Sequence, residues 1–183
     1  YKRQGKTTKL PPRSAPLHFE KNIIRWGDIA FDLPATLSST GRPLEINNIP
    51  YRGAIRLLPS RSAVINELSC EEYLLGVVGR ESRPDFELAA LRAQAVASRT
   101  YVLYQYLFRR KSPWHVTDTT ASQVYGGHGQ IPDSVRRAVR ETFGLVLSYR
   151  GKVFQAYYHA ACGGNTTKAS KYFSEPDIPP LRG

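Results

Sequence analysis

Glu81 is the residue whose type and position most clearly suggest chemistry. It follows Leu74 and Val78 at a spacing that places all three on one stripe of a helix. A glutamate that ends an apolar stripe is unusual, because this residue is almost never fully buried unless it is paired. The spacing alone leaves two interpretations open: an acid that donates and accepts a proton, or a helix-end carboxylate paired with an arginine.

Arg92 and Arg99 form a second candidate group. They are seven residues apart and therefore share one face of a helix that carries few other charges. Because a helix with so few charges is mostly buried, both arginines need anionic partners. Internal carboxylates would serve, and so would the carboxylates of an anionic ligand held by forked hydrogen bonds.

The stripe that ends at Glu81 requires a helix with defined ends. Ser69 and Glu72 form a capping-box pattern, which predicts a helix over residues 71–82. Pro84 disfavours helical geometry at the residue before it and so ends this helix.

Two further helices are predicted, over residues 87–108 and from Asp133, the expected cap, to Thr142. The first of these is long and central. It carries a stripe of small residues that would let another element approach closely: Ala89, Ala93, Ala97 and Thr100.

Strands are predicted as hairpins. Residues 54–58 and 63–68 flank a four-residue turn, and residues 145–149 and 152–157 flank Arg150 and Gly151. We therefore expect an α+β fold, with a helical lobe around a long central helix, a β-hairpin lobe and the active-site cleft between them.

Composition narrows the class of protein. The 183 residues include 26 Lys and Arg against 15 Asp and Glu, a net charge of +11, and 41% are hydrophobic, as in a globular domain. No apolar run is long enough for a membrane span. A basic chain favours anionic partners, but nucleic acid is not expected, since no zinc-finger spacing, RNA-binding strand or helix-turn-helix occurs.

The charge also suggests a domain boundary. Residues 1–22 hold six basic residues and Glu20 alone as an acid, a net charge of +5, and we expect a Pro-containing arm there, followed by one domain over residues 23–183. Because the chain opens at Tyr1 and has no Met, we expect a processed, exported chain.

Five pieces of sequence, in order, resemble one protein family. Val64 to Leu68 leads into the helix with Gly76, Val77 and Val78 before Glu81. The pieces that follow are residues 91–101, 118–125, 141–144 and 158–164. Together they resemble the SpoIID/LytB family, the stage II sporulation protein D family of cell-wall lytic transglycosylases.

The resemblance implies an enzyme that cleaves peptidoglycan glycan strands without stem peptides, with Glu81 as the catalytic acid. It implies a bacterial cell-envelope or periplasmic location, a role in sporulation, division or wall remodelling, and no cofactor. LytB-type relatives also permit another class, a glycan-binding module that stimulates a partner amidase without cutting.

Other residues gain roles under this resemblance. A denuded strand carries one lactyl carboxylate per disaccharide, which Arg92 and Arg99 could hold. Gln94, Gln123 and Tyr125 could bond sugar hydroxyl or N-acetyl groups, or could simply satisfy buried polar groups. His159 could orient Glu81, touch the sugar or be structural, and Gly163 and Gly164 could form a tight turn or contact the substrate through their backbone.

The sequence departs from the family at three places. Ser82 stands where Met usually follows the glutamate, Cys162 stands where Ser or Thr usually precedes the paired glycines, and the family generally continues beyond the end of this chain. Cys70 and Cys162 could form a disulfide in an exported protein. A metal is not expected, because the segment from His115 to Gln123 lacks the cysteines of some relatives.

Overall fold

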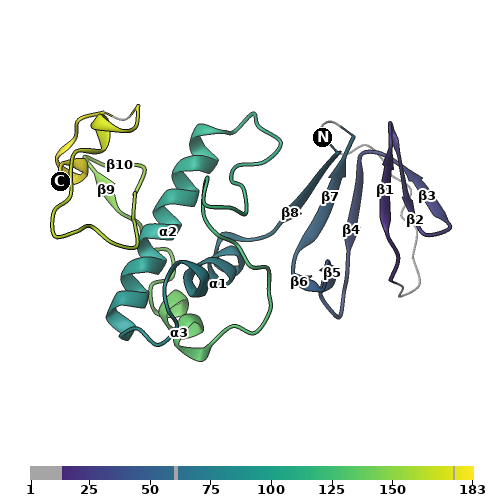
Figure 1. Cartoon of the computed structure of the whole chain (residues 1–183), viewed down its shortest axis with the longest axis horizontal. Coiled ribbons are helices and arrows are strands. Elements are labelled where there is room, and N and C mark those ends of the chain that lie inside the picture. The colour runs from purple at the N-terminus through teal and green to yellow at the C-terminus, as the bar shows by residue number, and fades with distance from the viewer. Residues whose placement is uncertain (1–13, 60–61, 175) are drawn as a thin grey trace. The chain divides into compact units, whose positions relative to one another are not determined.

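The computed structural model describes residues 14–59, 62–174 and 176–183. It contains both helices and strands, so the α+β prediction is confirmed (Figure 1). The chain forms two compact units. One comprises the chain as far as Leu37 together with residues 55–65, and the other comprises residues 38–54 and 66–183.

The first unit is made of short antiparallel strands. Three consecutive strands form one sheet: β1 (Leu17–Glu20), β2 (Ile23–Trp26) and β3 (Ile29–Asp32). A second sheet has the order β4-β7-β8, from β4 (Ala35–Ser38), β7 (Ala54–Leu58) and β8 (Ala63–Glu67). The predicted pairing of residues 54–58 with 63–68 is therefore confirmed, although residues 60 and 61 of its turn lie outside the described part.

Strand β1 lies within the range expected for the N-terminal arm. Leu17 and Phe19 are half-buried and alternate with exposed His18 and Glu20. This alternation is typical of a strand with one covered face. Residues 17–20 are therefore part of a sheet, in which they pair with β2. Residues 1–13 lie outside the described residues, and the division into an arm and one domain stays a prediction.

Three helices organise the second unit (Figure 1): α1 (Cys70–Glu81), α2 (Leu88–Phe108) and α3 (Asp133–Glu141). Ser69 begins α1 as predicted, since its hydroxyl oxygen accepts from the Glu72 amide at 3.3 Å. The Glu72 carboxylate accepts from the Ser69 hydroxyl at the same distance. The expected cap of α3 is wrong: Pro132 occupies that position, so Asp133 is the first helical residue.

The three helices share one apolar core. α1 and α3 each contribute part of it, and Leu91 and Ala95 of α2 lie between them, with exposed fractions of 0%. The buried side chains are Leu74, Val78, Leu91, Ala95, Val135, Ala138 and Val139. Because Leu74 and Val78 are buried here, the stripe that ends at Glu81 is aimed into this unit.

Short elements complete the second unit. β5 (Leu44–Ile46) pairs with β6 (Ile49–Tyr51), and β9 (Ser148–Tyr149) pairs with β10 (Lys152–Val153). Two 3₁₀ turns follow, η2 (Ala169–Lys171) and η3 (Pro179–Leu181).

The β9–β10 hairpin is shorter than the predicted one, because the Leu147 amide donates to the Thr100 hydroxyl oxygen of α2 at 2.9 Å instead of to a strand. Thr100 belongs to the small-residue stripe, which therefore admits a neighbouring segment. Among the described residues, no helix has the length and apolarity needed to cross a membrane.

Candidate functional site

Glu81 is the last residue of α1, and its carboxylate has a specific partner. The backbone amide of Val124 donates a hydrogen bond of 2.6 Å to Oε1. The side chain is half-buried, and within the described residues no arginine forms an ion pair with it. Of the two interpretations left open by the sequence, a carboxylate neutralised by an arginine is therefore not what the structure contains.

The segment that binds Glu81 is held close to α1 by a glycine. The Gly126 amide donates to the Gly76 carbonyl oxygen at 3.1 Å. A side chain at Gly76 would collide with the Tyr125 ring and the Gly127 carbonyl. The absence of a Cβ at this helical position therefore sets the distance between the segment and α1, and with it the position of Val124.

A chain of buried polar groups lies beside this carboxylate. The Tyr73 hydroxyl donates to Gln123 Oε1 at 3.2 Å, and Gln123 Nε2 donates to the Tyr158 hydroxyl oxygen at 3.0 Å. The same Nε2 also donates to the Ser98 carbonyl at 3.3 Å. Gln123 is fully buried, so these bonds fix the amide orientation and join α1, α2 and two later segments.

The two phenols of this chain lie within electrostatic range of Glu81. Burial raises the pKa of Tyr158 to about 12; the hydrogen bond with Gln123 lowers it and the Glu81 carboxylate raises it. Burial also raises the pKa of Tyr73, with smaller contributions from neighbouring tyrosines and Glu81. Both hydroxyls are therefore protonated at neutral pH and can donate hydrogen bonds.

Gln94 belongs to the same region. It accepts from the Ser82 hydroxyl at 3.3 Å, and its amide nitrogen donates to the Ser98 hydroxyl oxygen at 3.0 Å. Ser82 directly follows Glu81, so the residue that departs from the family pattern has a hydrogen-bond partner here. The structure thus places Gln94 beside the residue that follows Glu81, and a role of Gln94 and Gln123 in substrate binding stays a prediction.

Tyr125 has a supporting position. Its ring stacks on Tyr73 with centroids 5.1 Å apart, and its hydroxyl donates to Asn66 Oδ1 at 2.8 Å. The ring therefore supports the Tyr73 ring, and the hydroxyl is bound to Asn66. Both the ring and the hydroxyl of Tyr125 therefore have partners inside the protein, which was the alternative to sugar binding.

Arg99 is committed to an internal ion pair. Its side chain is 4% exposed and makes two hydrogen bonds of 2.8 Å to the Glu71 carboxylate. Further bonds reach backbone carbonyls, including Leu145 O at 3.1 Å. Glu71 lies about 15 Å along the helix axis from Glu81, since ten residues separate them. Of the two partners left open for Arg99 by the sequence, an internal carboxylate is the one present in the structure.

Arg92 likewise has an internal partner. It pairs with Glu141 at the end of α3, and the same carboxylate also accepts from Arg137 at 2.7 Å. The hydrogen bonds from the two arginines keep the pKa of Glu141 low. Arg92 therefore ties α2 to α3 rather than presenting a free guanidinium beside Glu81.

The turn with the paired glycines is exposed. Gly163 and Gly164 have φ values of 61° and 98°, which explains why glycines stand there. His159 is exposed, and no bond from it to Glu81 occurs among the described residues. Its neighbour Tyr158 reaches the site instead. The sequence signal that was missed is alternation: in an extended segment, consecutive side chains point to opposite sides.

The cysteines and histidines do not form a metal site in the part that the structure describes. There, no three His, Cys, Asp or Glu side chains gather in a way that could hold a metal ion. Cys70 and Cys162 are both free and exposed. His115 packs edge-on against the Tyr106 ring at a centroid distance of 4.9 Å.

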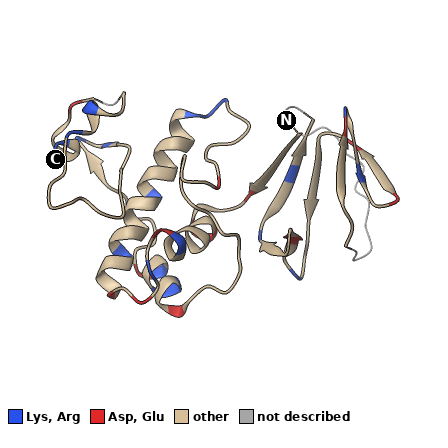
Figure 2. Ribbon diagram, viewed as in Figure 1, with Lys and Arg blue, Asp and Glu red and all other residues tan. Residues whose placement is uncertain are grey.

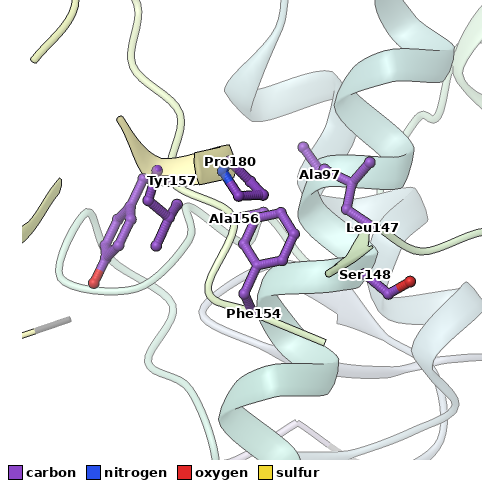
Figure 3. A pocket seen from close by; sticks show the side chains of 8 residues that line it. Ala97, Leu147, Ser148, Phe154, Ala156, Tyr157 and Pro180 are labelled. Carbon is purple, nitrogen blue, oxygen red and sulfur yellow. The ribbon is translucent and has the colours of Figure 1, made fainter. Parts of the chain in front are cut away.

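An apolar cavity lies in the second unit, and Glu81 is not among the residues that line it. It has a volume of about 350 Å³ and is lined mainly by apolar groups, with Ala97 of α2 on one side and Leu147, Phe154 and Ala156 among the others (Figure 3). Its lining contains no carboxylate, histidine or lysine, so it lacks the usual groups for proton transfer near neutral pH. Arginines occur on α1, α2 and α3, and these three helices contain no lysine (Figure 2).

Comparison with known proteins places the chain in a family. A family model described as stage II sporulation protein, SpoIID, matches residues 60–149. This match covers the helix with Glu81, the segment with Val124 and the arginines of α2. The chain belongs to the SpoIID family.

Three relatives illustrate the spread of this family. An amidase enhancer of Bacillus subtilis is 32% identical over 178 residues, covering 95% of this chain and 24% of the enhancer. An uncharacterized protein of Brachyspira hyodysenteriae is 41% identical over 131 residues, covering 70% of this chain and 36% of that protein. A stage II sporulation protein D of Bacillus amyloliquefaciens is 29% identical, covering 64% and 38%. The SpoIID chain thus spans well under half of these relatives.

Proposed function

We propose that this SpoIID protein is a peptidoglycan lytic transglycosylase that acts on glycan strands stripped of stem peptides. The observation that carries the proposal is the carboxyl group of Glu81, which lacks an arginine partner among the described residues and is oriented by the Val124 amide. Such a group can serve as an acid and then as a base in one reaction.

The reaction needs one carboxyl group and no water. Protonated Glu81 donates its proton to the glycosidic oxygen between MurNAc and GlcNAc, and the bond from the MurNAc anomeric carbon to that oxygen breaks. The resulting carboxylate accepts the proton of the MurNAc 6-hydroxyl, whose oxygen bonds to the anomeric carbon. The products are a 1,6-anhydro-MurNAc end and a GlcNAc hydroxyl, and Glu81 regains its proton.

The neighbouring groups have roles in this scheme that follow from their bonds. The Val124 amide occupies Oε1, which leaves Oε2 as the atom that exchanges the proton. Gln123 is fully buried and holds the Tyr73 and Tyr158 hydroxyls in place, and half-buried Tyr158 is the member of this group that suits a hydroxyl or N-acetyl group of a sugar. We place the protein outside the cytoplasm, where its substrate is.

The decisive experiment is a digest of amidase-stripped glycan strands, read by mass spectrometry, with wild type beside Glu81→Gln. We expect 1,6-anhydro-MurNAc ends from wild type and a loss of at least about a hundredfold in the variant, since general acid–base catalysis contributes that much. Glu72→Gln is the matched control, because it removes a carboxylate on the same helix. Reducing ends that carry water would identify a hydrolase instead.

A second function has one observation in its favour, the similarity to a protein named amidase enhancer. In this alternative the chain binds glycan strands and stimulates a cell-wall amidase without cutting them. Glu81→Gln separates the two functions: a binding module would keep full amidase stimulation and strand binding in this variant. A variant that loses cleavage but keeps stimulation would assign both functions to the chain.

A further inference from the structure

A small cavity of about 170 Å³ lies between α1 and the segment after Tyr125. Glycines leave much of it open, since they contribute no side chains to the space. Its lining includes five of them and one charged residue: Gly76, Gly79, Gly126, Gly127, Gly129 and Arg80.

Arg80 is the residue of this cavity that can bind a charged ligand. It is exposed, and within the described residues it has neither an ion pair nor a hydrogen bond. Its guanidinium rests on the backbone at Gly126, where a Cβ would collide with Nε. Arg83, three residues later, differs in that Asp85 neutralises it at 2.7 Å.

The cavity adjoins the catalytic candidate. Arg80 and Glu81 are consecutive, so their Cα atoms are about 3.8 Å apart and their side chains leave α1 about 100° apart. The same segment contacts both residues, through the Val124 amide at Glu81 and through Gly126 at Arg80. A strand seated on Glu81 therefore passes within reach of this guanidinium.

We propose that Arg80 and its glycine-lined cavity bind the free lactyl carboxylate of a muramic acid residue and thereby select strands without stem peptides. The inference rests on the proposed function. A guanidinium forms paired hydrogen bonds with a carboxylate. The volume equals that of about five or six water molecules, enough for a lactyl group. An attached stem peptide converts the carboxylate into an uncharged amide, which removes the charge with which the guanidinium would pair.

The test uses two preparations of the same denuded strands, one with free lactyl carboxylates and one with these groups converted to methylamides. For wild type we expect the KM for free strands to be about tenfold lower than for amidated strands, the loss expected from one charge-assisted pair. Arg80→Gln should abolish this difference by raising the KM for free strands alone, and Arg80→Lys should restore part of it.

Two further variants make the result specific. Arg83→Gln removes the same charge at a site outside the cavity and should keep the tenfold preference. Gly126→Ala keeps every charge but displaces the guanidinium, so it should lose the preference while the melting temperature reports its folding. If Arg80→Gln keeps the preference, the inference is wrong. If wild type cuts neither strand, the proposed function fails, and the affinity of the two strands for wild type and Arg80→Gln decides the inference independently.

Discussion

At the scale of single residues, the site depends on buried phenols that stay protonated. Tyr158 has a pKa of about 12 against the usual 10 for a tyrosine, mainly because it is buried. As the pH rises above 10, the unfolded chain therefore loses this proton before the folded protein does. The stabilisation that comes from this shift is complete below pH 10 and is lost as the pH approaches 12.

This difference can be measured with Tyr158→Phe, which has no proton to lose. Between pH 9 and pH 11.5 we expect the free energy of unfolding of wild type to fall more than that of the variant in urea titrations, by about 1 kcal/mol or less, because solvent screens the half-buried phenol. Tyr172→Phe, which changes an exposed tyrosine, should follow wild type. Parallel curves for wild type and Tyr158→Phe would show that the phenol does not titrate as described.

Some residues of the candidate site could be predicted from the sequence, and others could not. Glu81 stands out because a carboxylate ends an apolar helical stripe. Tyr158 and the Val124 amide do not, because a phenol has many structural uses and a backbone donor has no sequence signal. For Arg99, the sequence predicted the buried position but not the partner. Helical periodicity does not tell which carboxylate a buried arginine binds, and in the structure it is Glu71 of α1.

At the scale of elements, one glycine sets the packing of the Val124 segment against α1. Gly76→Ala would improve helix propensity, yet its methyl group would collide with the Tyr125 ring and the Gly127 carbonyl. We expect the segment to move away, which would lower strand cleavage at least tenfold and destabilise the fold by about 1–3 kcal/mol.

Gly79→Ala is the matched control for this prediction. It lies on the same helix, and its new Cβ would have its nearest neighbour at 3.5 Å, an ordinary contact with Val135. This variant should gain up to about 1 kcal/mol in a urea titration, in contrast to the loss expected for Gly76→Ala. Equal behaviour of the two alanine variants would show that close approach at Gly76 is not required.

The Arg99–Glu71 pair joins the helices. Glu71→Ala leaves a guanidinium that is 4% exposed without its carboxylate, and removal of one partner of a buried pair costs about 3–5 kcal/mol. We expect the urea midpoint to fall accordingly. Glu72→Ala, which removes only the exposed capping carboxylate, should cost about 1 kcal/mol or less. Similar losses in both variants would mean that Arg99 finds other acceptors.

Helices were easier to predict than strands for a physical reason. The start of α1 was fixed by Ser69 and Glu72 and its end by Pro84, and all of these signals are local. The β9–β10 hairpin was overestimated because Thr100 of α2 takes the Leu147 amide, a contact that depends on tertiary packing. The same limit applies to β1, whose four residues become a strand only because β2 pairs with them.

At the scale of the whole molecule, charge should control how the protein meets its substrate. Residues 1–13 contain five basic and no acidic residues, so they account for +5 of the net charge of +11. A denuded glycan strand is a polyanion, and attraction between exposed charges is screened within about 10 Å at 0.1 M salt. The arm should therefore strengthen strand binding at low salt and add little at high salt.

Replacing these five basic residues by Gln tests this role, because the substitution removes the charge and keeps the length of the segment. In co-sedimentation with denuded strands we expect at least a fivefold weaker affinity at 50 mM NaCl and a difference below twofold at 500 mM. An arm with the same thirteen residues in scrambled order should bind as wild type, since non-specific attraction depends on charge rather than order. If scrambling weakens binding as much as neutralisation does, the arm recognises its partner through specific contacts, and net charge is not what brings the strand to Glu81.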